Sequence, residues 1–331
     1  MKPKNIYLIA AITLLLASCS QNEVPVVPTN KPTTVEFSSV KPLALDPGTE
    51  YLAENATVRV LAYKRVGTNP DLTKDIFMGQ NTYYVSNTQG KLTACTVDAA
   101  GIKIGTSTEK LQLIQGKYDF YAFTPAVGIT GVPTIGTAIA VKPNIAVNNG
   151  NDYAISLTPN EQVYVTSNPV QTIELATLQR QCTKIIFDID KHTGVSTSSF
   201  TTVVINSATL SDMPNNTYTA KLGESMAGIT PDPGNPLSIF EVLNKTNGSQ
   251  TAYTGEMIVL PRAKQDMLLS MNIKFDTEAA ATYTKNIPDV ELEPGKEYTF
   301  IIRLIKDSIL FELEVADWDG TISLTDDNVG A

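Results

Sequence analysis

The chain has 331 residues, of which 42% are hydrophobic and 18% are charged, and its formal net charge is −9. This hydrophobic content is ample for packed cores, and the length exceeds one typical domain and favours two. Basic residues do not cluster anywhere along the sequence. The composition therefore argues against a nucleic-acid partner.

The N-terminus has the layout of a secretory signal. Lys2 and Lys4 precede an apolar run from Ile6 to Leu16 that only Thr13 interrupts. A helix of that length spans about 16 Å, roughly half the hydrocarbon thickness of a bilayer. We therefore expect residues 1–18 to direct export and not to span a membrane.

The apolar run ends in Leu16-Ala17-Ser18-Cys19, which resembles the lipobox of bacterial lipoprotein precursors. This resemblance implies that Leu16, Ala17 and Ser18 are recognised by the signal peptidase and that Cys19 becomes the acylated N-terminus. Two or three acyl chains anchor a protein stably, whereas one chain binds only reversibly. The alternative is a plain signal peptide followed by an incidental cysteine.

After the lipobox, residues 19–32 contain three prolines and form an expected stiff, extended linker. From Thr33 onward, turn-forming residues separate short segments that are β-branched, aromatic and often alternating, which indicates an all-β fold. Only residues 173–181 could form a short helix outside the signal. The strongest strand candidates are residues 58–63, 118–123, 184–190, 202–205, 256–260 and 267–275.

The clearest expected hairpin lies near the C-terminus. Apolar side chains alternate along residues 298–304 and again along residues 309–315, and the polar turn 306–308 separates the two runs. Each strand therefore has one buried face and one wetter face. Trp318 closes the second strand, and we expect it to cover one end of the core.

An internal repeat accompanies this hairpin. Residues 111–118 align with residues 290–298 at a constant offset of 179 up to the lysine, after which the second copy gains one residue. Each copy predicts a strand with two inward aliphatic side chains, a glycine turn and a returning aromatic strand. A repeat this short can also arise by chance. With the length, it favours two related sandwiches, over residues 33–169 and 170–331.

Motifs for catalysis and metal binding are incomplete. His192 is the single histidine, residues 188–194 lack the later ligands of a calcium loop, and residues 223–227 lack the final glycine of a nucleophile elbow. We therefore predict a non-enzymatic protein with no catalytic residue, no metal site and no cofactor. Cys95 and Cys182 are expected to be buried free thiols.

Several short motifs follow the lipobox and the proline-rich start in order, namely Gly116–Phe123, Asp152–Ala154, Cys182–Phe187, Gly295–Phe300 and Asp317-Trp318. In this order the chain resembles the fimbrillin-like lipoproteins, the type V pilin superfamily of Gram-negative gut and oral bacteria. The resemblance implies two tandem transthyretin-like β-sandwich domains, and a place as shaft, tip or anchor subunit of a surface fimbria. It also implies attachment to the cell outer membrane through the lipid on Cys19, with other fimbrial subunits or further copies as partners.

In that family an Arg- or Lys-specific protease removes an N-terminal strand, and a strand from a neighbouring subunit fills the groove by β-strand addition. By this resemblance Thr34–Phe37 is the candidate exchangeable strand, with Val35 and Phe37 pointing inward. Thr321–Leu324 is the candidate donor strand, with Ile322 and Leu324 as its apolar side chains.

The chain departs from the shaft pattern at the expected cleavage site. No arginine lies between Cys19 and Arg59, and Lys31 and Lys41 are each followed by proline. Unless Arg59 or Arg65 is cut, the first strand stays in place, which favours an anchor, a tip or a stand-alone member. The alternative function is that of a stand-alone surface lipoprotein that binds a glycan or a host protein through loops at one end of a sandwich.

Overall fold

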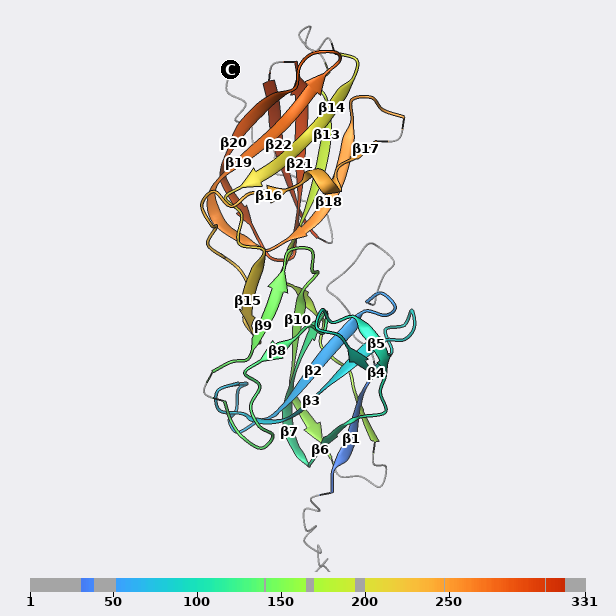
Figure 1. Cartoon of the computed structure of the whole chain (residues 1–331). Coiled ribbons are helices and arrows are strands. Elements are labelled where there is room, and N and C mark those ends of the chain that lie inside the picture. The colour runs from blue at the N-terminus through green and yellow to red at the C-terminus, as the bar shows by residue number, and fades with distance from the viewer. Residues whose placement is uncertain are drawn as a thin grey trace, which may run out of the picture.

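The computed structural model describes residues 31–38, 52–139, 141–164, 170–193, 200–246, 248–306 and 308–318. Over these ranges the protein is all-β, with strands in five sheets and one short 3-10 helix, η1 (Phe240–Val242). The predicted all-β fold is confirmed. Figure 1 shows two groups of sheets arranged end to end; residues up to Arg180 build the first and residues from Thr183 build the second, except that β15 (Thr217–Lys221) joins the first.

The first group is built around a seven-stranded sheet that faces a three-stranded sheet across a hydrophobic core. The seven-stranded sheet has the order β12-β10-β7-β2-β3-β4-β5, and the three-stranded sheet has the order β11-β1-β6. The strands of the larger sheet are β2 (Thr57–Lys64), β3 (Ile76–Val85), β4 (Leu92–Val97), β5 (Lys103–Thr106), β7 (Gly116–Thr124), β10 (Ala154–Val163) and β12 (Gln179–Arg180); those of the smaller are β1 (Thr33–Phe37), β6 (Leu111–Leu113) and β11 (Val170–Ile173).

A third layer covers the opposite face of the seven-stranded sheet. It consists of β8 (Ile129–Thr130), β9 (Asn144–Asn148) and β15 (Thr217–Lys221), in the order β15-β9-β8. Its apolar side chains share a second core with outward residues of β2 and β7. Because both faces of the sheet are covered at its centre, β2 and β7 read as nearly continuous apolar runs.

Strand β15 comes from the second half of the chain, yet it pairs antiparallel with β9 of the first half. We call residues 217–229 the strap. Ala220, Leu222 and Met226 of the strap are buried against the first half, in the core that contains Tyr63 and Tyr121. The strap therefore joins the two halves through apolar packing and a β-ladder.

The second group is a sandwich of a five-stranded and a four-stranded sheet around one core. The five-stranded sheet has the order β17-β18-β13-β21-β22, and the four-stranded sheet has the order β16-β14-β19-β20. Strands β21 and β22 form the predicted C-terminal hairpin. The strands are β13 (Thr183–Lys191), β17 (Asn244–Lys245), β18 (Tyr253–Val259), β21 (Lys296–Ile305), β22 (Ser308–Asp317), β14 (Val203–Ser211), β16 (Leu237–Ser238), β19 (Arg262–Phe275) and β20 (Ala281–Leu292).

The chain passes from the first group to the second beyond Arg180. Strand β11 pairs with β1, and β12 pairs with β10, so residues 170–180 belong to the sheets of the first group. The prediction of a short helix at residues 173–181 is wrong. In this stretch the chain instead crosses from one sheet of the first group to the other. The crossing buries the side chains of Ile173, Leu175 and Leu178 in the first core.

The two copies of the internal repeat make equivalent contacts. Each copy connects a strand of one sheet to a strand of the facing sheet, β6 to β7 and β20 to β21. The buried Tyr118 hydroxyl donates to the carbonyl oxygen of Ile114 at 2.8 Å, and the buried Tyr298 hydroxyl accepts from the amide of Glu293 at 3.0 Å. Ile114 and Glu293 are aligned positions of the repeat, so both tyrosines hold the same point of the connection.

Cys95 and Cys182 are both buried free thiols, as expected. Burial raises the pKa of the Cys182 thiol to about 12, which keeps it protonated and unreactive at neutral pH. None of the described residues forms a helix long and apolar enough to cross a bilayer.

We predict that Tyr118→Phe and Tyr298→Phe each lower the free energy of unfolding by about 0.5–1.5 kcal/mol, because each change removes one partly buried hydrogen bond and keeps the ring. Urea denaturation measures the effect. If neither change alters stability, the two tyrosines do not share a role in closing the sandwiches.

We predict that the strap tolerates no side chain at Gly223. Gly223 and Gly228 both have a positive φ, but only a Cβ at Gly223 meets a neighbour, the ring of Tyr121 at 2.9 Å. Gly228→Ala, the matched control, should cost about 1 kcal/mol from backbone strain, and Gly223→Ala about 2–4 kcal/mol because overpacking adds to it. Equal losses in thermal or urea unfolding would show that the strap is not held tightly against the first half.

Candidate functional site

Strand β1 is hydrogen-bonded along both of its edges. It pairs parallel with β11 over Thr34–Phe37 and antiparallel with β6 over Thr33–Val35. The amide of Ser38 adds a further bond to the carbonyl oxygen of Ile173 at 3.1 Å. If β1 were absent, β6 and β11 would border a groove of the width of one strand.

The inward side chains of β1 close the core of the first group. Val35 and Phe37 are buried, in the orientation that the alternation of the sequence predicts. The Phe37 ring meets the rings of Tyr83 and Phe120 edge-to-face, each at 5.4 Å between centroids. Edge-to-face geometry is favourable for aromatic pairs. Burial in this core also raises the pKa of the Tyr83 hydroxyl above its usual value.

The outward side chains of β1, Thr34 and Glu36, contact β6 and the residue that precedes it. The side-chain amide nitrogen of Gln112 donates to the hydroxyl of Thr34 at 2.8 Å, and the carboxylate of Glu36 forms an ion pair with Lys110. Thr33 lies on the buried face with Val35 and Phe37, and its hydroxyl donates to the carbonyl oxygen of Tyr164 at 2.9 Å. These contacts favour a single register, since a slip of one residue would turn the apolar side chains to solvent.

The two arginines considered as cleavage points lie in or beside the central strand of the larger sheet. Arg59 lies within β2 and is half-buried, and Arg65 directly follows β2. Arg65 donates through Nε to the fully buried carboxylate of Asp119 at 3.1 Å and forms a second, short bond with it. The hydrogen bonds to Asp119 raise the pKa of Arg65, so Arg65 stays charged.

A cut at either arginine would therefore divide β2 or detach it along with β1. Strand β2 pairs with both β3 and β7, so its loss would dismantle the seven-stranded sheet. Release of β1 alone requires a cut between Ser38 and Thr57. In that stretch Lys41 is the single lysine or arginine, and Pro42 follows it.

The other residues assigned from the sequence fall outside the residues that the structure describes. They are the lipobox residues Leu16, Ala17, Ser18 and Cys19 and the donor residues Ile322 and Leu324. The described residues contain no group of three or more histidine, cysteine, aspartate or glutamate side chains that could hold a metal ion. His192 lies just after β13, where its amide donates to the carbonyl oxygen of Leu304 at 3.0 Å.

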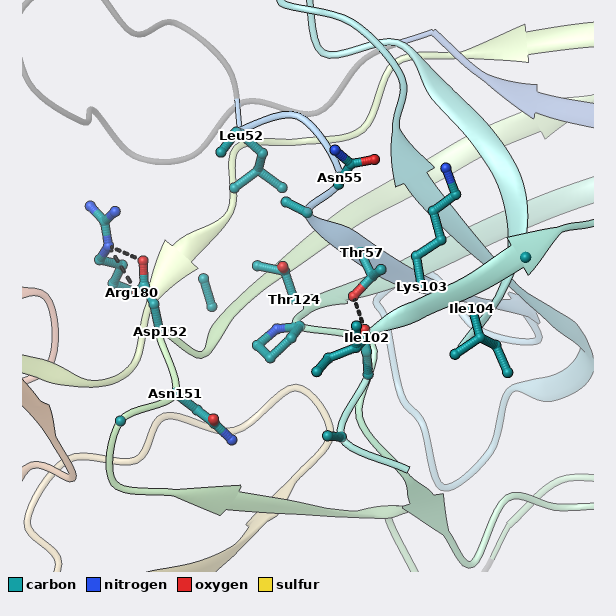
Figure 2. Close-up of a pocket in the computed structure, with 18 of the residues that line it drawn as sticks. Leu52, Asn55, Thr57, Ile102, Lys103, Ile104, Thr124, Asn151, Asp152 and Arg180 are labelled. Carbon is teal, nitrogen blue, oxygen red and sulfur yellow. Dashed lines mark hydrogen bonds and ion pairs between the residues drawn. The ribbon is translucent and has the colours of Figure 1, made fainter. Parts of the chain in front are cut away.

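A cleft of about 940 Å³, which sequence reasoning missed, is lined by residues of the first group alone, from the starts of β2 and β5 to Arg180. Figure 2 shows the ion pair of Arg180 and Asp152 on one side of this cleft and Ile102 and Ile104 of the β5 region on the other. Nε of Arg180 lies 3.0 and 3.1 Å from the two carboxylate oxygens of Asp152. The two isoleucines are more than 60% exposed, at 63% and 68%.

Arg180 also contacts the second half of the chain. Its guanidinium carbon lies 4.2 Å from the centre of the Trp318 ring, within the range of a cation–π contact. Trp318 was expected to cover one end of the core of its own sandwich; its ring instead packs on an arginine of the first group. No pattern in the sequence pairs these two residues, which lie 138 positions apart.

The fimbrillin-like family model matches residues 24–321, so the chain belongs to the fimbrillin-like family. Membership supports the prediction of a non-enzymatic fimbrial or adhesion protein of the cell surface. A search of curated protein sequences finds no match.

Solved structures show the same fold at low sequence identity. A candidate cell adhesion protein from Bacteroides fragilis is 16% identical, with a TM-score of 0.54 over 90% of this chain and 100% of that chain. One from Bacteroides uniformis is 14% identical, with a TM-score of 0.52 over 88% and 99% of the two chains. A fimbrial protein from Bacteroides vulgatus is 13% identical, with a TM-score of 0.51 over 87% and 100%.

We predict that Phe37→Ala lowers the free energy of unfolding by about 3–5 kcal/mol, because it leaves a cavity between Tyr83 and Phe120. Glu36→Gln on the same strand is the control, and it should cost less than about 1 kcal/mol because its ion pair is exposed. Chemical denaturation of both variants makes the comparison. Similar small losses would mean that β1 adds little to the core.

Proposed function

We propose that the protein is a lipid-anchored subunit of a fimbria-like surface assembly that keeps its own first strand. It would then serve as an anchor, a tip or a stand-alone adhesive member, and not as a shaft subunit. The observation that carries this proposal is β1, which is paired on both edges and buries Val35 and Phe37. A filled groove cannot receive the strand of a neighbour.

The position of the basic residues supports retention of β1. Arg65 is held against the buried carboxylate of Asp119, and Arg59 lies within the central strand β2. Lys41 is the remaining site that would release β1 alone, and trypsin-like proteases cut poorly before proline such as Pro42. An Arg- or Lys-specific protease would therefore leave the first strand in place.

The same proposal includes the membrane anchor and the domain arrangement. Cys19 carries the lipid after recognition of Leu16, Ala17 and Ser18, and a fully extended chain of the linker's length would reach at most about 50 Å from it to β1. Beyond the linker, two transthyretin-like domains follow in tandem. The pairing of β11 and β12 with the first group supports a boundary near Cys182 in place of residue 169.

The C-terminal segment completes the proposed assembly. Ile322 and Leu324 would lie on one face of a short strand donated to a neighbouring subunit, which does not require this chain to open its own groove. The fold similarity to a Bacteroides vulgatus fimbrial protein and to candidate adhesion proteins supports a place in such an assembly.

The test compares the wild-type protein with Pro42→Ala, which makes Lys41 an ordinary cleavage site. Both are treated while folded with an Arg-specific and with a Lys-specific protease, and their N-termini are mapped by intact mass. We expect the wild type to retain β1 and the variant to be cut after Lys41. Release of β1 from the wild-type protein, or a native N-terminus beyond Phe37, would make the protein a polymerising shaft subunit and overturn the proposal.

A further inference from the structure

A second cleft, of about 640 Å³, shares Gly150 and Arg180 with the first and lies at the junction between the two halves. We call it the junction cleft. Arg180 and Trp318 line it beside a charged cluster of Lys184, Glu256 and Glu297. Its volume is within the range of small-molecule sites, which often form between domains.

Trp318 provides an aromatic wall that is already held in place. One face of its indole ring packs against Arg180 at 4.2 Å, and Asp152 holds Arg180 through two hydrogen bonds from Nε. The amide of Trp318 also donates to the carbonyl oxygen of Gly295 at 3.0 Å. A flat ligand that packs on this indole therefore loses little free energy to ordering the side chain.

The charged cluster provides hydrogen-bond donors and acceptors within one small area. Nζ of Lys184 lies 3.1 Å from a carboxylate oxygen of Glu256 and 3.3 Å from one of Glu297. The three residues come from β13, β18 and β21, which are adjacent in the five-stranded sheet. Burial opposes the charge of Lys184, but the hydrogen bonds and charges of the two glutamates outweigh it and raise its pKa.

This combination fits a ligand with many hydroxyl groups. A hydroxyl both donates and accepts, so it can bond to a carboxylate and to an ammonium group at once. A sugar ring also has an apolar face of C–H groups, which packs on an aromatic ring. Glu256 is 70% exposed and can reach a ligand without losing its contact with the protein.

The charge balance indicates a neutral ligand. The guanidinium of Arg180 is paired with Asp152, and the ammonium of Lys184 is shared between two carboxylates. An anionic group would meet cations that are already neutralised, and it would approach the exposed Glu256. The free-energy cost of desolvating such an anion would therefore not be offset by new ion pairs.

We propose that the junction cleft binds a neutral saccharide, with Trp318 stacking on a sugar ring and the cluster of Lys184, Glu256 and Glu297 bonding to its hydroxyls. The site does not depend on whether β1 is retained. Its failure and the failure of the proposed function are therefore distinguishable.

Trp318 is the single tryptophan of the chain, so intrinsic fluorescence reports on the cleft directly. We would titrate the folded protein with maltohexaose, mannohexaose and xylohexaose, and with oligosialic acid as the anionic probe, each to about 10 mM, which detects millimolar affinity. We expect a saturable change in emission with at least one neutral probe and none with oligosialic acid. No response to any neutral probe, or a stronger response to oligosialic acid, would overturn the proposal.

Variants then locate the binding by titration calorimetry with the neutral probe that responds. Trp318→Leu and Glu256→Gln should each weaken binding at least ten-fold, and the exposure of Glu256 ensures that the second variant folds. Glu278→Gln is the matched control, since Glu278 pairs with Lys306 beyond the far end of β21. Undiminished binding by Glu256→Gln, or equal losses in all three variants, would place the sugar elsewhere.

Discussion

The structure depends on covering both faces of the seven-stranded sheet of the first group. Its central strands β2 and β7 are apolar on both sides, so either face left open would expose aromatic and aliphatic side chains to water. Strand β1 covers one face together with β6 and β11, and the strap covers the other together with β9. The stability of the sheet thus depends on segments from the start of the chain and from its second half.

This constraint connects the fold to function. Strand β1 is a local element whose loss would open one groove, whereas β2 is shared by two ladders and cannot be removed without the sheet. The positions of Arg59 and Arg65 matter for this reason. Under the proposed function, the retention of β1 would make this fimbrillin-like chain an end point or a separate unit of an assembly.

The junction between the halves combines packing with polar chemistry. The strap, the contact of Arg180 with Trp318 and the hydrogen bond from the amide of Gly150 to the carbonyl oxygen of Ile258 hold the two groups together. Side chains from both halves therefore line a cleft that neither half forms alone. A site of this kind exists only while the halves keep their relative position.

The sequence by itself determined the all-β fold, the inward orientation of Val35 and Phe37, the C-terminal hairpin and the two tyrosine-containing connections, because period-two alternation and turn residues act locally. Tertiary structure alone decided the pairing of β1 with β11, the path of the strap and the meeting of Arg180 with Trp318. These contacts join residues 69 to 138 positions apart. The alternation of apolar and polar side chains along a strand predicts which face is buried, but it does not predict which strand lies beside it.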